Sequence, residues 1–443
     1  MTRTNCNFLS KHNIMSKVRD SDSCFIVNLL SRNADIISES DAEALNNLDF
    51  ESLANINEYI KKGYLIPSIK AEESLFKNSY LDFIEERDNS EIQIFFVLSY
   101  NCNFTCSYCY QDGYESSKQK LNSDIINAFF KYIEKFRKKY ITLFGGEPLL
   151  PNEESKNNIK TIISKANEKN IGIAVVTNGY SLLEYIDILK EGIIREVQVT
   201  LDGPAIIHNK RRSLKNGNET FSKIVEGIDA LIAANIPVNL RMVVDKENIG
   251  SLSELANFAI EKGWTKSSLF KTQIGRNYEL HFCQSNQNKL FDRLSLYEEI
   301  YKQLDSHPEI LEFHHPSFSV SKFLFENGEL PEALFDSCPG CKTEWAFDYT
   351  GSIFSCTATV GKEDEKLGTF YPEVYLNDDL VEEWEERDIL SIPDCIHCKL
   401  NLACGGGCAS VAKNRTGKLH TPDCRPVKEL LEMGMNVYFE RSQ

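Results

Sequence analysis

Three cysteines in one short loop have the spacing of an iron–sulfur site. Cys102, Cys106 and Cys109 stand in the segment NCNFTCSYCY as C-x3-C-x2-C. Three thiolates at this spacing can bind three irons of a 4Fe-4S cube and leave the fourth iron without a protein ligand. An open coordination position is typical of a catalytic metal site. The alternatives are a zinc knuckle or scattered core cysteines, but zinc sites usually add a second cysteine pair or histidines.

A second group of cysteines lies in the last third of the chain. Its members are Cys338, Cys341, Cys356, Cys395, Cys398, Cys404, Cys408 and Cys424. Eight ligands are the number that would close two 4Fe-4S clusters completely. Two zinc ribbons are the alternative, which paired C-x2-C motifs alone would favour. The C-x5-C and C-x3-C intervals that follow the second pair argue against ribbons.

The elements that must position the first loop are strands alternating with helices. Apolar strands are predicted at IQIFFVL, YITLFGG, IGIAVVT, REVQVTL, PVNLRMV and YELHFC, the last over 278–283. Helices are predicted over 124–139, 158–169, 181–191, 221–234 and 251–262. This alternation indicates βαβ units and a parallel sheet. Six units predict an α/β fold, an open partial (β/α)6 barrel, with its site at the C-terminal ends of the strands.

Two further motifs stand at predicted strand ends. FGGEP contains Gly145, Gly146, Glu147 and Pro148, and its glycines allow the backbone to come close to a ligand. The fourth strand is followed by a segment that contains Thr200, Asp202, Gly203, His208 and Arg212. An arginine can bind a carboxylate as a charged fork. Asp202 has an alternative role, which is to cap the turn at Gly203.

These motifs together resemble those of the radical S-adenosylmethionine (SAM) enzymes. In that family the open iron chelates SAM, and reductive cleavage yields a 5'-deoxyadenosyl radical that abstracts hydrogen from the substrate. The resemblance implies that the Gly145 to Pro148 segment contacts the methionine amino group and that Tyr108 lies beside the adenine. It also implies that Thr200 and Arg212 lie near the SAM carboxylate, with Asp202 in the same segment.

The order of the C-terminal cysteines resembles the SPASM domain of peptide- and protein-modifying members of that family. The resemblance implies that one auxiliary 4Fe-4S cluster is ligated by Cys338, Cys341, Cys356 and Cys408. It implies that a second is ligated by Cys395, Cys398, Cys404 and Cys424. The chain would therefore hold three 4Fe-4S clusters and SAM. The resemblance covers residues 92 to about 430, and predicts a barrel over 91–330 and a SPASM domain over 331–443.

Residues 1–90 form a predicted small α+β module. CFIVNLL and ADIIS are expected to pair as a hairpin across Ser31, Arg32 and Asn33, with two helices and a short strand after them. One hypothesis is a packing extension of the barrel. The other is a docking module that pairs an extended peptide with a strand edge. The position of the module resembles that of the leader-docking module of peptide maturases.

Composition excludes several classes of protein. A formal net charge of -16 argues against nucleic-acid binding. We expect no membrane span, because no apolar run approaches the required length. The N-terminus lacks the apolar region of a secretion signal, so the cysteines of the chain are expected to be reduced thiols and metal ligands. A cytoplasmic location is therefore expected.

The predicted function is maturation of a ribosomally made peptide, with thioether or other crosslink formation as the expected reaction. Formylglycine formation of the anaerobic sulfatase-maturase type and peptide epimerisation are the alternatives. Sulfatase maturases carry an aspartate directly after the cysteine that corresponds to Cys356, where this chain has Thr357. A precursor peptide with a leader and an electron donor such as flavodoxin or ferredoxin are the expected partners. An iron–sulfur electron carrier or a zinc scaffold is the non-enzymatic alternative.

Overall fold

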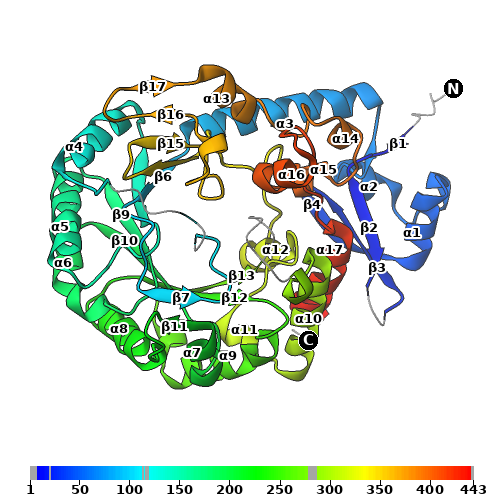
Figure 1. Ribbon diagram of the computed structural model, residues 1–443. Helices are drawn as coiled ribbons and strands as arrows, with labels where there is room; N and C mark the ends of the chain where they lie inside the picture. Colours follow the sequence, from blue (N-terminus) through cyan, green and yellow to red (C-terminus); the bar gives the residue numbers. More distant parts are fainter. Residues whose placement is uncertain (1–6, 19–20, 112–113, 115–118, 278–286, 441–443) are drawn as a thin grey trace.

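A curved sheet forms the centre of the computed structural model, which describes residues 7–18, 21–111, 114, 119–277 and 287–440 (Figure 1). Ten strands of this part of the chain hydrogen-bond in the order β13-β12-β10-β9-β8-β6-β14-β15-β16-β17. The six strands from β13 to β6 are parallel to their neighbours. Their bounds are β6 (Ile92–Val97), β8 (Lys139–Phe144), β9 (Gly172–Thr177), β10 (Ile194–Thr200), β12 (Val238–Val244) and β13 (Phe270–Arg276).

Helices cover the outer face of this sheet (Figure 1). They are α4 (Ser123–Tyr132), α5 (Glu153–Glu168), α6 (Ile186–Lys190), α7 (Ala205–Arg211), α8 (Phe221–Ala233) and α9 (Leu252–Glu261). Strand residues alternate between the helices and the interior of the curve. In β8, Ile141 and Leu143 are fully buried in the core shared with the helices, whereas Tyr140, Thr142 and Phe144 line the interior. The α/β fold with a largely parallel sheet is confirmed.

The sixth strand lies earlier in the chain than the sequence pattern predicts. The predicted strand over 278–283 falls outside the described residues, and the strand that pairs with β12 is β13, which ends at Arg276. β13 reads FKTQIGR and places Lys271 and Gln273 against the interior cavity. Because these inward positions are polar, the strand has no apolar run that sequence patterning could recognise.

Helix bounds also differ from the predicted ones. The first predicted helix, 124–139, ends at Tyr132, because the chain must turn and begin β8 at Lys139. The second begins at Glu153, five residues before its predicted start at residue 158, with Asn152 accepting a hydrogen bond from the Ser155 backbone. An asparagine in this position caps the first turn of a helix. The predicted helices 221–234 and 251–262 are confirmed as α8 and α9 to within one residue at each end.

The C-terminal region adds strands to the same sheet. β14 (Glu344–Asp348) pairs in parallel with β6, and β15 (Ser352–Phe354), β16 (Gly368–Thr369) and β17 (Tyr375–Leu376) follow in antiparallel order. The later cysteines lie among short helices, which are α13 (Asp378–Glu385), α14 (Pro393–Ile396), α15 (Asn401–Cys404), α16 (Ala409–Thr416) and α17 (Val427–Met435). Between barrel and cysteines run α10 (Arg293–Ser306), α11 (Ile310–Phe313) and α12 (Ser321–Asn327). The barrel and the cysteine-rich region therefore share one continuous sheet.

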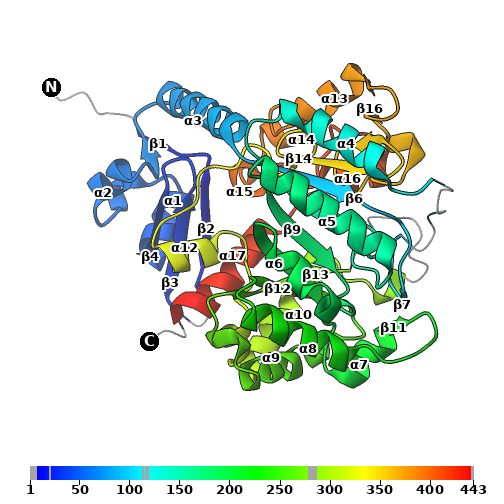
Figure 2. The same cartoon turned by 90° about the vertical axis from the view of Figure 1, so that its left-hand side faces the viewer.

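The N-terminal module consists of a three-stranded antiparallel sheet and three helices. The predicted hairpin is confirmed as β3 (Ser23–Asn28) and β4 (Asn33–Ser38), and β2 (Asn13–Lys17) pairs with the other side of β3. α1 (Glu39–Asn46) and α2 (Ile56–Lys61) follow, then β5 (Leu65–Ile66), which pairs with β1 (Phe8–Leu9). The 21-residue helix α3 (Ile69–Asn89) leads from the module to the barrel (Figure 2).

The module packs against the C-terminal region through a shared hydrophobic core. Phe76, Tyr80 and Phe83 of α3 surround Phe335 with ring centroids 5.1, 5.3 and 5.6 Å away. Val27 and other residues of β3 join the same core, and α17 lies beside β2 in both views (Figures 1 and 2). The module therefore contributes to the packing of the whole chain. No helix among the described residues combines the length and the apolar character needed to cross a membrane.

Candidate functional site

A cavity of about 700 Å³ lies inside the curve of the parallel strands. Its walls bring together eight residues that the sequence analysis singled out, namely Cys102, Cys106, Tyr108, Cys109, Gly145, Gly146, Thr200 and Arg212. They come from the loops after β6 and β8, the end of β10 and the segment after α7. Their convergence follows from the parallel sheet, since the C-terminal ends of its strands meet at one edge.

The cysteine loop is held by a small strand pair that the sequence patterns did not predict. β7 (Phe104–Cys106) pairs antiparallel with β11 (Arg212–Leu214), so that Cys106 and Arg212 are direct cross-strand partners. Arg212 Nη1 donates a 2.6 Å hydrogen bond to the Tyr108 hydroxyl. Arg212 Nε is buried and has no hydrogen-bond partner. The pairing therefore places an arginine with an unused donor beside the loop.

Burial disfavours the ionised cysteines that a metal requires, and the charge of Arg212 acts against this effect at Cys106. Burial raises the pKa of Cys102 to about 11 and that of Cys106 to about 11. The Arg212 charge acts in the opposite direction on the Cys106 pKa. Burial also opposes the charge of Arg212, but Cys106, Tyr108 and Asp202 outweigh that effect and raise its pKa. Because metal ligation requires the thiolate, Arg212 supports ligation by Cys106.

Gly145 and Gly146 are required by a close approach of two backbone segments. Gly146 N donates to Ser99 O at 2.8 Å, and Glu147 N donates to Asn101 O at 2.9 Å. A Cβ atom on Gly146 would lie 2.2 Å from Asn101 O, and Gly145 has a φ of +133°. Side chains at either position would therefore push away the segment that leads into the cysteine loop. The glycines position that loop as well as lining the cavity.

Glu147 lies behind the cavity wall. Its carboxylate accepts hydrogen bonds from Thr177 Oγ1 at 2.6 Å, from Asn178 N at 2.6 Å and from Leu149 N at 2.8 Å. Burial raises its pKa, while these three donors act in the opposite direction. Pro148 is buried beside it. The side chain of Glu147 thus joins the loops after β8 and β9, and a contact of this segment with SAM remains a prediction for its backbone.

We expect Glu147→Gln to destabilise the protein. The glutamine NH2 group would face one of the three groups that now donate hydrogen bonds to the carboxylate. Two donors would then lie opposite each other, which lowers the unfolding free energy by about 2 to 3 kcal/mol. Anaerobic urea unfolding should show an earlier midpoint than the wild type, with the exposed Glu219→Gln as the matched control. An unchanged midpoint would mean that the three hydrogen bonds do not order these loops.

Asp202 also lies outside the cavity wall. It is fully buried, accepts a hydrogen bond from Val243 N at 3.1 Å and pairs with Arg211 Nε at 3.3 Å. The His208 ring bridges the Asp202 backbone N–H and Thr220 Oγ1 at 3.2 and 3.1 Å. These contacts tie the end of β10 to β12 and to α7. Asp202 therefore has the contacts of a residue that anchors the turn after β10.

Two residues of β12 in the cavity wall were missed by the sequence analysis. Asn239 and Arg241 occupy alternate positions of the strand VNLRMVV and face the cavity. Asn239 Oδ1 and Arg241 Nε are buried without hydrogen-bond partners. Arg241 lies opposite Thr200 on one side and Gln273 on the other. The signal that could have found them is the pair of polar residues at alternate positions of an otherwise apolar strand. In a buried strand, this pattern indicates that one side faces a cavity.

The eight C-terminal cysteines separate into two groups of four. Burial raises the pKa of Cys356 to about 12, and the nearby charges of Glu344, Cys338 and Cys408 raise it further. Cys341 is close enough to Cys356 and Cys338 to interact electrostatically with both. Burial also raises the pKa of Cys395 to about 11, and here the neighbouring thiolates are Cys404, Cys398 and Cys424. The assignment of these cysteines to two auxiliary clusters remains a prediction of the family resemblance.

Arg387 organises the loops that carry these cysteines. It is fully buried, and its guanidinium donates to the carbonyl oxygens of Leu419 (2.8 Å), Gly407 (3.2 Å), Gly406 (3.0 Å) and Thr421 (2.9 Å). The first and last of these lie just before Cys424, and the glycines lie between Cys404 and Cys408. A buried charge is retained only when it is fully hydrogen-bonded. No sequence pattern pointed to Arg387.

The three donor sets consist of cysteines alone, which are the usual ligands of iron–sulfur clusters. Among the described residues, no three histidine, cysteine, aspartate or glutamate side chains lie close enough together to hold one metal ion. Each cysteine group is nevertheless compact enough for its charges to interact. A tetrahedral zinc site holds its sulfurs about 2.3 Å from one atom. Sets of four cysteines are also the ligands of a 4Fe-4S cube, so the assignment to clusters remains a prediction.

Sequence comparisons match the barrel to a known family. Residues 96–259 match the Radical SAM superfamily. A probable GTP 3',8-cyclase of Sulfurisphaera tokodaii is 28% identical over 257 residues, which cover 55% of this chain and 74% of the relative. A second, from Sulfolobus acidocaldarius, is 28% identical over 45% of this chain and 62% of its own length. The radical SAM cyclopropyl synthase TigE of Paramaledivibacter caminithermalis is 21% identical over 86% of this chain and 83% of the relative.

Solved structures share the fold over most of the chain. Native anSMEcpe with bound AdoMet superposes with a TM-score of 0.61 at 19% identity, covering 79% of this chain and 97% of that one. Streptococcus suis SuiB bound to the precursor peptide SuiA has a TM-score of 0.55 at 13% identity, covering 94% of this chain and 99% of that one. The fold similarity therefore extends beyond the barrel.

Proposed function

The chain is a radical SAM enzyme, and we propose that it matures a ribosomally made peptide by forming an intramolecular crosslink, with a thioether as the first expected product. The observation that carries this proposal is the pair of four-cysteine groups, the first of which includes a cysteine beside the catalytic cavity. Thr357 and Ala358, which directly follow Cys356, line that cavity. A ligand of the first auxiliary cluster would thus lie directly beside the cavity wall.

Electron balance explains why such clusters suit a crosslinking enzyme. Joining a thiol sulfur to a carbon removes two hydrogen atoms from the peptide. Bound SAM and the cluster on Cys102, Cys106 and Cys109 would supply hydrogen-atom abstraction at the cavity. The second hydrogen leaves as a proton and an electron when the new bond forms. The two four-cysteine groups offer a route for that electron toward an external carrier such as a flavodoxin or ferredoxin.

Three residues of the cavity would contact different parts of SAM. Arg212 has an unused buried donor beside the cysteine loop, and a guanidinium suits the SAM carboxylate. Thr200 faces the same cavity and supplies a hydroxyl. Tyr108 is held in place by Arg212, so its ring has a defined orientation for the adenine. These roles remain proposals.

A second candidate is the formation of a carbon–carbon bond. The relative that matches 86% of this chain is named a cyclopropyl synthase, whereas the cyclases match barrel-sized segments only. Closing such a ring also removes two hydrogen atoms. Thiol alkylation of the product separates the two reactions, because a thioether has consumed a cysteine thiol and a cyclopropane has not.

Anaerobic reconstitution and a precursor peptide test the proposed function. We expect about twelve irons per chain, release of 5'-deoxyadenosine on reduction, and a product lighter by two hydrogen atoms when the enzyme is co-expressed with a short peptide encoded beside it. Stoichiometric zinc without iron would contradict the assignment. A product of unchanged mass would indicate epimerisation instead.

We further propose that β4 of the N-terminal module docks the leader of the precursor. In the described residues β4 pairs only with β3, whereas β2 on the opposite edge lies against α17. Ile36 of β4 is 55% exposed, and a hollow of about 210 Å³ beside it is lined in part by Ile37, Ala54 and Tyr59. An added strand gains main-chain hydrogen bonds, and the hollow could take a side chain.

Ile36→Lys tests leader docking without removing the module. We expect the KM for the precursor to rise about tenfold with little change in kcat, because docking raises the local concentration of the core peptide. Deleting residues 1–90 is a poorer test, since it would expose the core around Phe335. The control is Ile193→Lys, at a 46% exposed isoleucine before β10. Equal KM values for the two variants would remove the docking role.

A further inference from the structure

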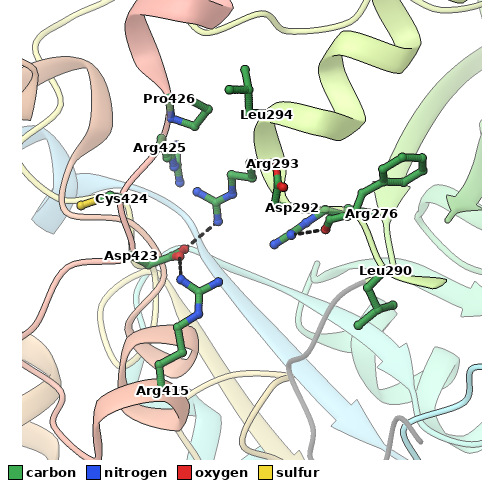
Figure 3. Close-up of a pocket in the computed structure, with 11 residues that line it drawn as sticks. Arg276, Leu290, Asp292, Arg293, Leu294, Arg415, Asp423, Cys424, Arg425 and Pro426 are labelled. Atoms are coloured by element: carbon green, nitrogen blue, oxygen red, sulfur yellow. Dashed lines mark hydrogen bonds and ion pairs between the residues drawn. The ribbon is translucent and has the colours of Figure 1, made fainter. Parts of the chain in front are cut away.

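A pocket lined by four arginines lies where the barrel meets the cysteine-rich region (Figure 3). Its volume is about 630 Å³. Arg276 ends β13, Arg293 begins α10, Arg415 belongs to α16, and Arg425 precedes α17. Two carboxylates, Asp292 and Asp423, also line it. The lining is therefore cationic in a chain whose formal net charge is -16.

The two carboxylates are already engaged. Asp423 is buried and pairs with Arg293 at 2.6 Å and with Arg415 at 3.2 Å, as Figure 3 shows. It also accepts a hydrogen bond from the backbone of Cys408 at 3.3 Å. Asp292 caps α10 by accepting a 2.8 Å hydrogen bond from Ser295 N, which lowers its pKa. Asp423 is thus already paired with two of the arginines, and the charge of Arg276 also contributes to the lowered pKa of Asp292.

Two of the arginines have unused donors. Arg293 Nη1 is buried without a hydrogen-bond partner. The Arg425 side chain has no hydrogen bond or ion pair among the described residues. Burial raises the pKa of Tyr297 on α10, while Arg293, Arg425 and Arg276 all lower it, which shows that three guanidinium groups lie near one phenol. A buried donor without a partner is costly, so these groups are suited to an anion.

The shape of the pocket suits an acidic side chain. Leu290, Phe291, Leu294 and Pro426 supply apolar surface between the charges. Arg276 lines both this pocket and the catalytic cavity. The pocket and the catalytic cavity therefore share Arg276 as a wall, so a peptide bound in one would lie close to the other. A concave site of this size can hold a short peptide segment that carries an acidic side chain, whereas the flat surface of a protein partner would not enter it.

We propose that this pocket binds a glutamate or aspartate side chain of the substrate peptide and so selects peptides with an acidic residue close to the modified position. The inference rests on the proposed peptide-modifying function and adds a charge requirement to it. Bidentate pairing with a guanidinium is the strongest common way to recognise a carboxylate. In an acidic protein, such a pocket also offsets the repulsion that an acidic peptide would otherwise meet.

Two short labelled peptides test the proposal on the wild-type protein. We would compare fluorescein-labelled Gly-Glu-Gly-Glu-Gly with Gly-Gln-Gly-Gln-Gly by anisotropy, anaerobically and without turnover. The glutamate peptide should bind about tenfold more tightly at low salt, and the preference should shrink when salt is raised to about 1 M. Equal binding of the two peptides would overturn the proposal.

Variants of Arg425 identify the pocket as the source of the preference. Arg425→Gln should lose most of the preference and Arg425→Lys should keep part of it, because lysine retains the charge but not the fork. Arg137→Gln, at an exposed arginine before β8, should match the wild type. An Arg425→Gln protein with full iron content and an unchanged preference would contradict the assignment. If that variant loses iron, the wild-type comparison and Arg425→Lys decide the question.

The outcome can be separated from that of the proposed function. Peptide binding is measured without SAM cleavage, so a precursor that keeps both its mass and the configuration of its residues would refute the maturase function and leave the binding result intact. An electron donor is the competing occupant. If Arg425→Gln binds both peptides as the wild type does, but is reduced more slowly by flavodoxin and equally fast by dithionite, the pocket serves the donor and the proposal is wrong.

Discussion

Replacing Cys102, Cys106 and Cys109 together by alanine is expected to abolish SAM cleavage and to lower the iron content by about a third. The three cysteines lie on one loop after β6, whereas the other eight lie on elements after β13. The triple variant should therefore keep both auxiliary clusters. Iron analysis and chromatographic detection of 5'-deoxyadenosine after reduction measure the two effects on the same sample.

A matched control for this variant is Cys24→Ala. Cys24 is a buried cysteine of β3 in the N-terminal module, far in sequence from all three groups. This variant should retain the wild-type iron content and deoxyadenosine release. Continued deoxyadenosine production by the triple variant would refute the assignment of the open cluster to this loop. A loss of more than half of the iron would mean that the cysteine groups do not fold independently.

Arg387→Met is expected to affect the auxiliary clusters and to leave the SAM-cleaving cluster in place, which is the opposite of the effect of the triple cysteine variant. Loss of the guanidinium leaves four carbonyl oxygens without a donor, and the loops before Cys408 and Cys424 should loosen. Breaking a buried charged network of this kind costs about 3 to 5 kcal/mol. We expect the iron content to fall by about a third or more, while uncoupled SAM cleavage persists. Iron analysis, deoxyadenosine release and unfolding midpoints measure these effects.

Arg137→Met is the control for Arg387→Met, because it removes an exposed arginine at the other side of the barrel sheet. It should leave the iron content and the unfolding midpoint unchanged. Full iron content in Arg387→Met would show that the cysteine loops keep their positions without it. Loss of SAM cleavage together with the iron would instead show that the barrel depends on the C-terminal loops.

Local patterns in the sequence determined much of the fold. Five of the six parallel strands are apolar runs, and the hairpin of β3 and β4 surrounds a short polar turn. Such features depend on residues that are neighbours in the chain, so periodicity and turn chemistry suffice to predict them. The three-cysteine loop belongs to this class, because all three ligands lie within eight residues. Its metal assignment remains a prediction.

Contacts between distant segments were decided by the tertiary structure. The pairing of Cys106 with Arg212 needs β7 and β11 to meet across the barrel mouth. β13 was missed because its inward side chains are polar and face the cavity, so the strand has no apolar run. Glu147 is not among the residues that line the catalytic cavity, because its carboxylate accepts hydrogen bonds from backbone and hydroxyl donors of the next loop. None of these three features can be recognised from residues that are neighbours in the sequence.

The two arginine sites illustrate the same limit most clearly. Arg387 donates to four carbonyl groups up to 34 residues away along the chain, and Arg276, Arg293, Arg415 and Arg425 meet in one pocket from four separate elements. Sequence alone identified the cysteines, since thiols are rare and their spacing is informative. A single arginine has no such spacing, and its role depends on which carbonyls and carboxylates the completed fold brings within hydrogen-bonding distance.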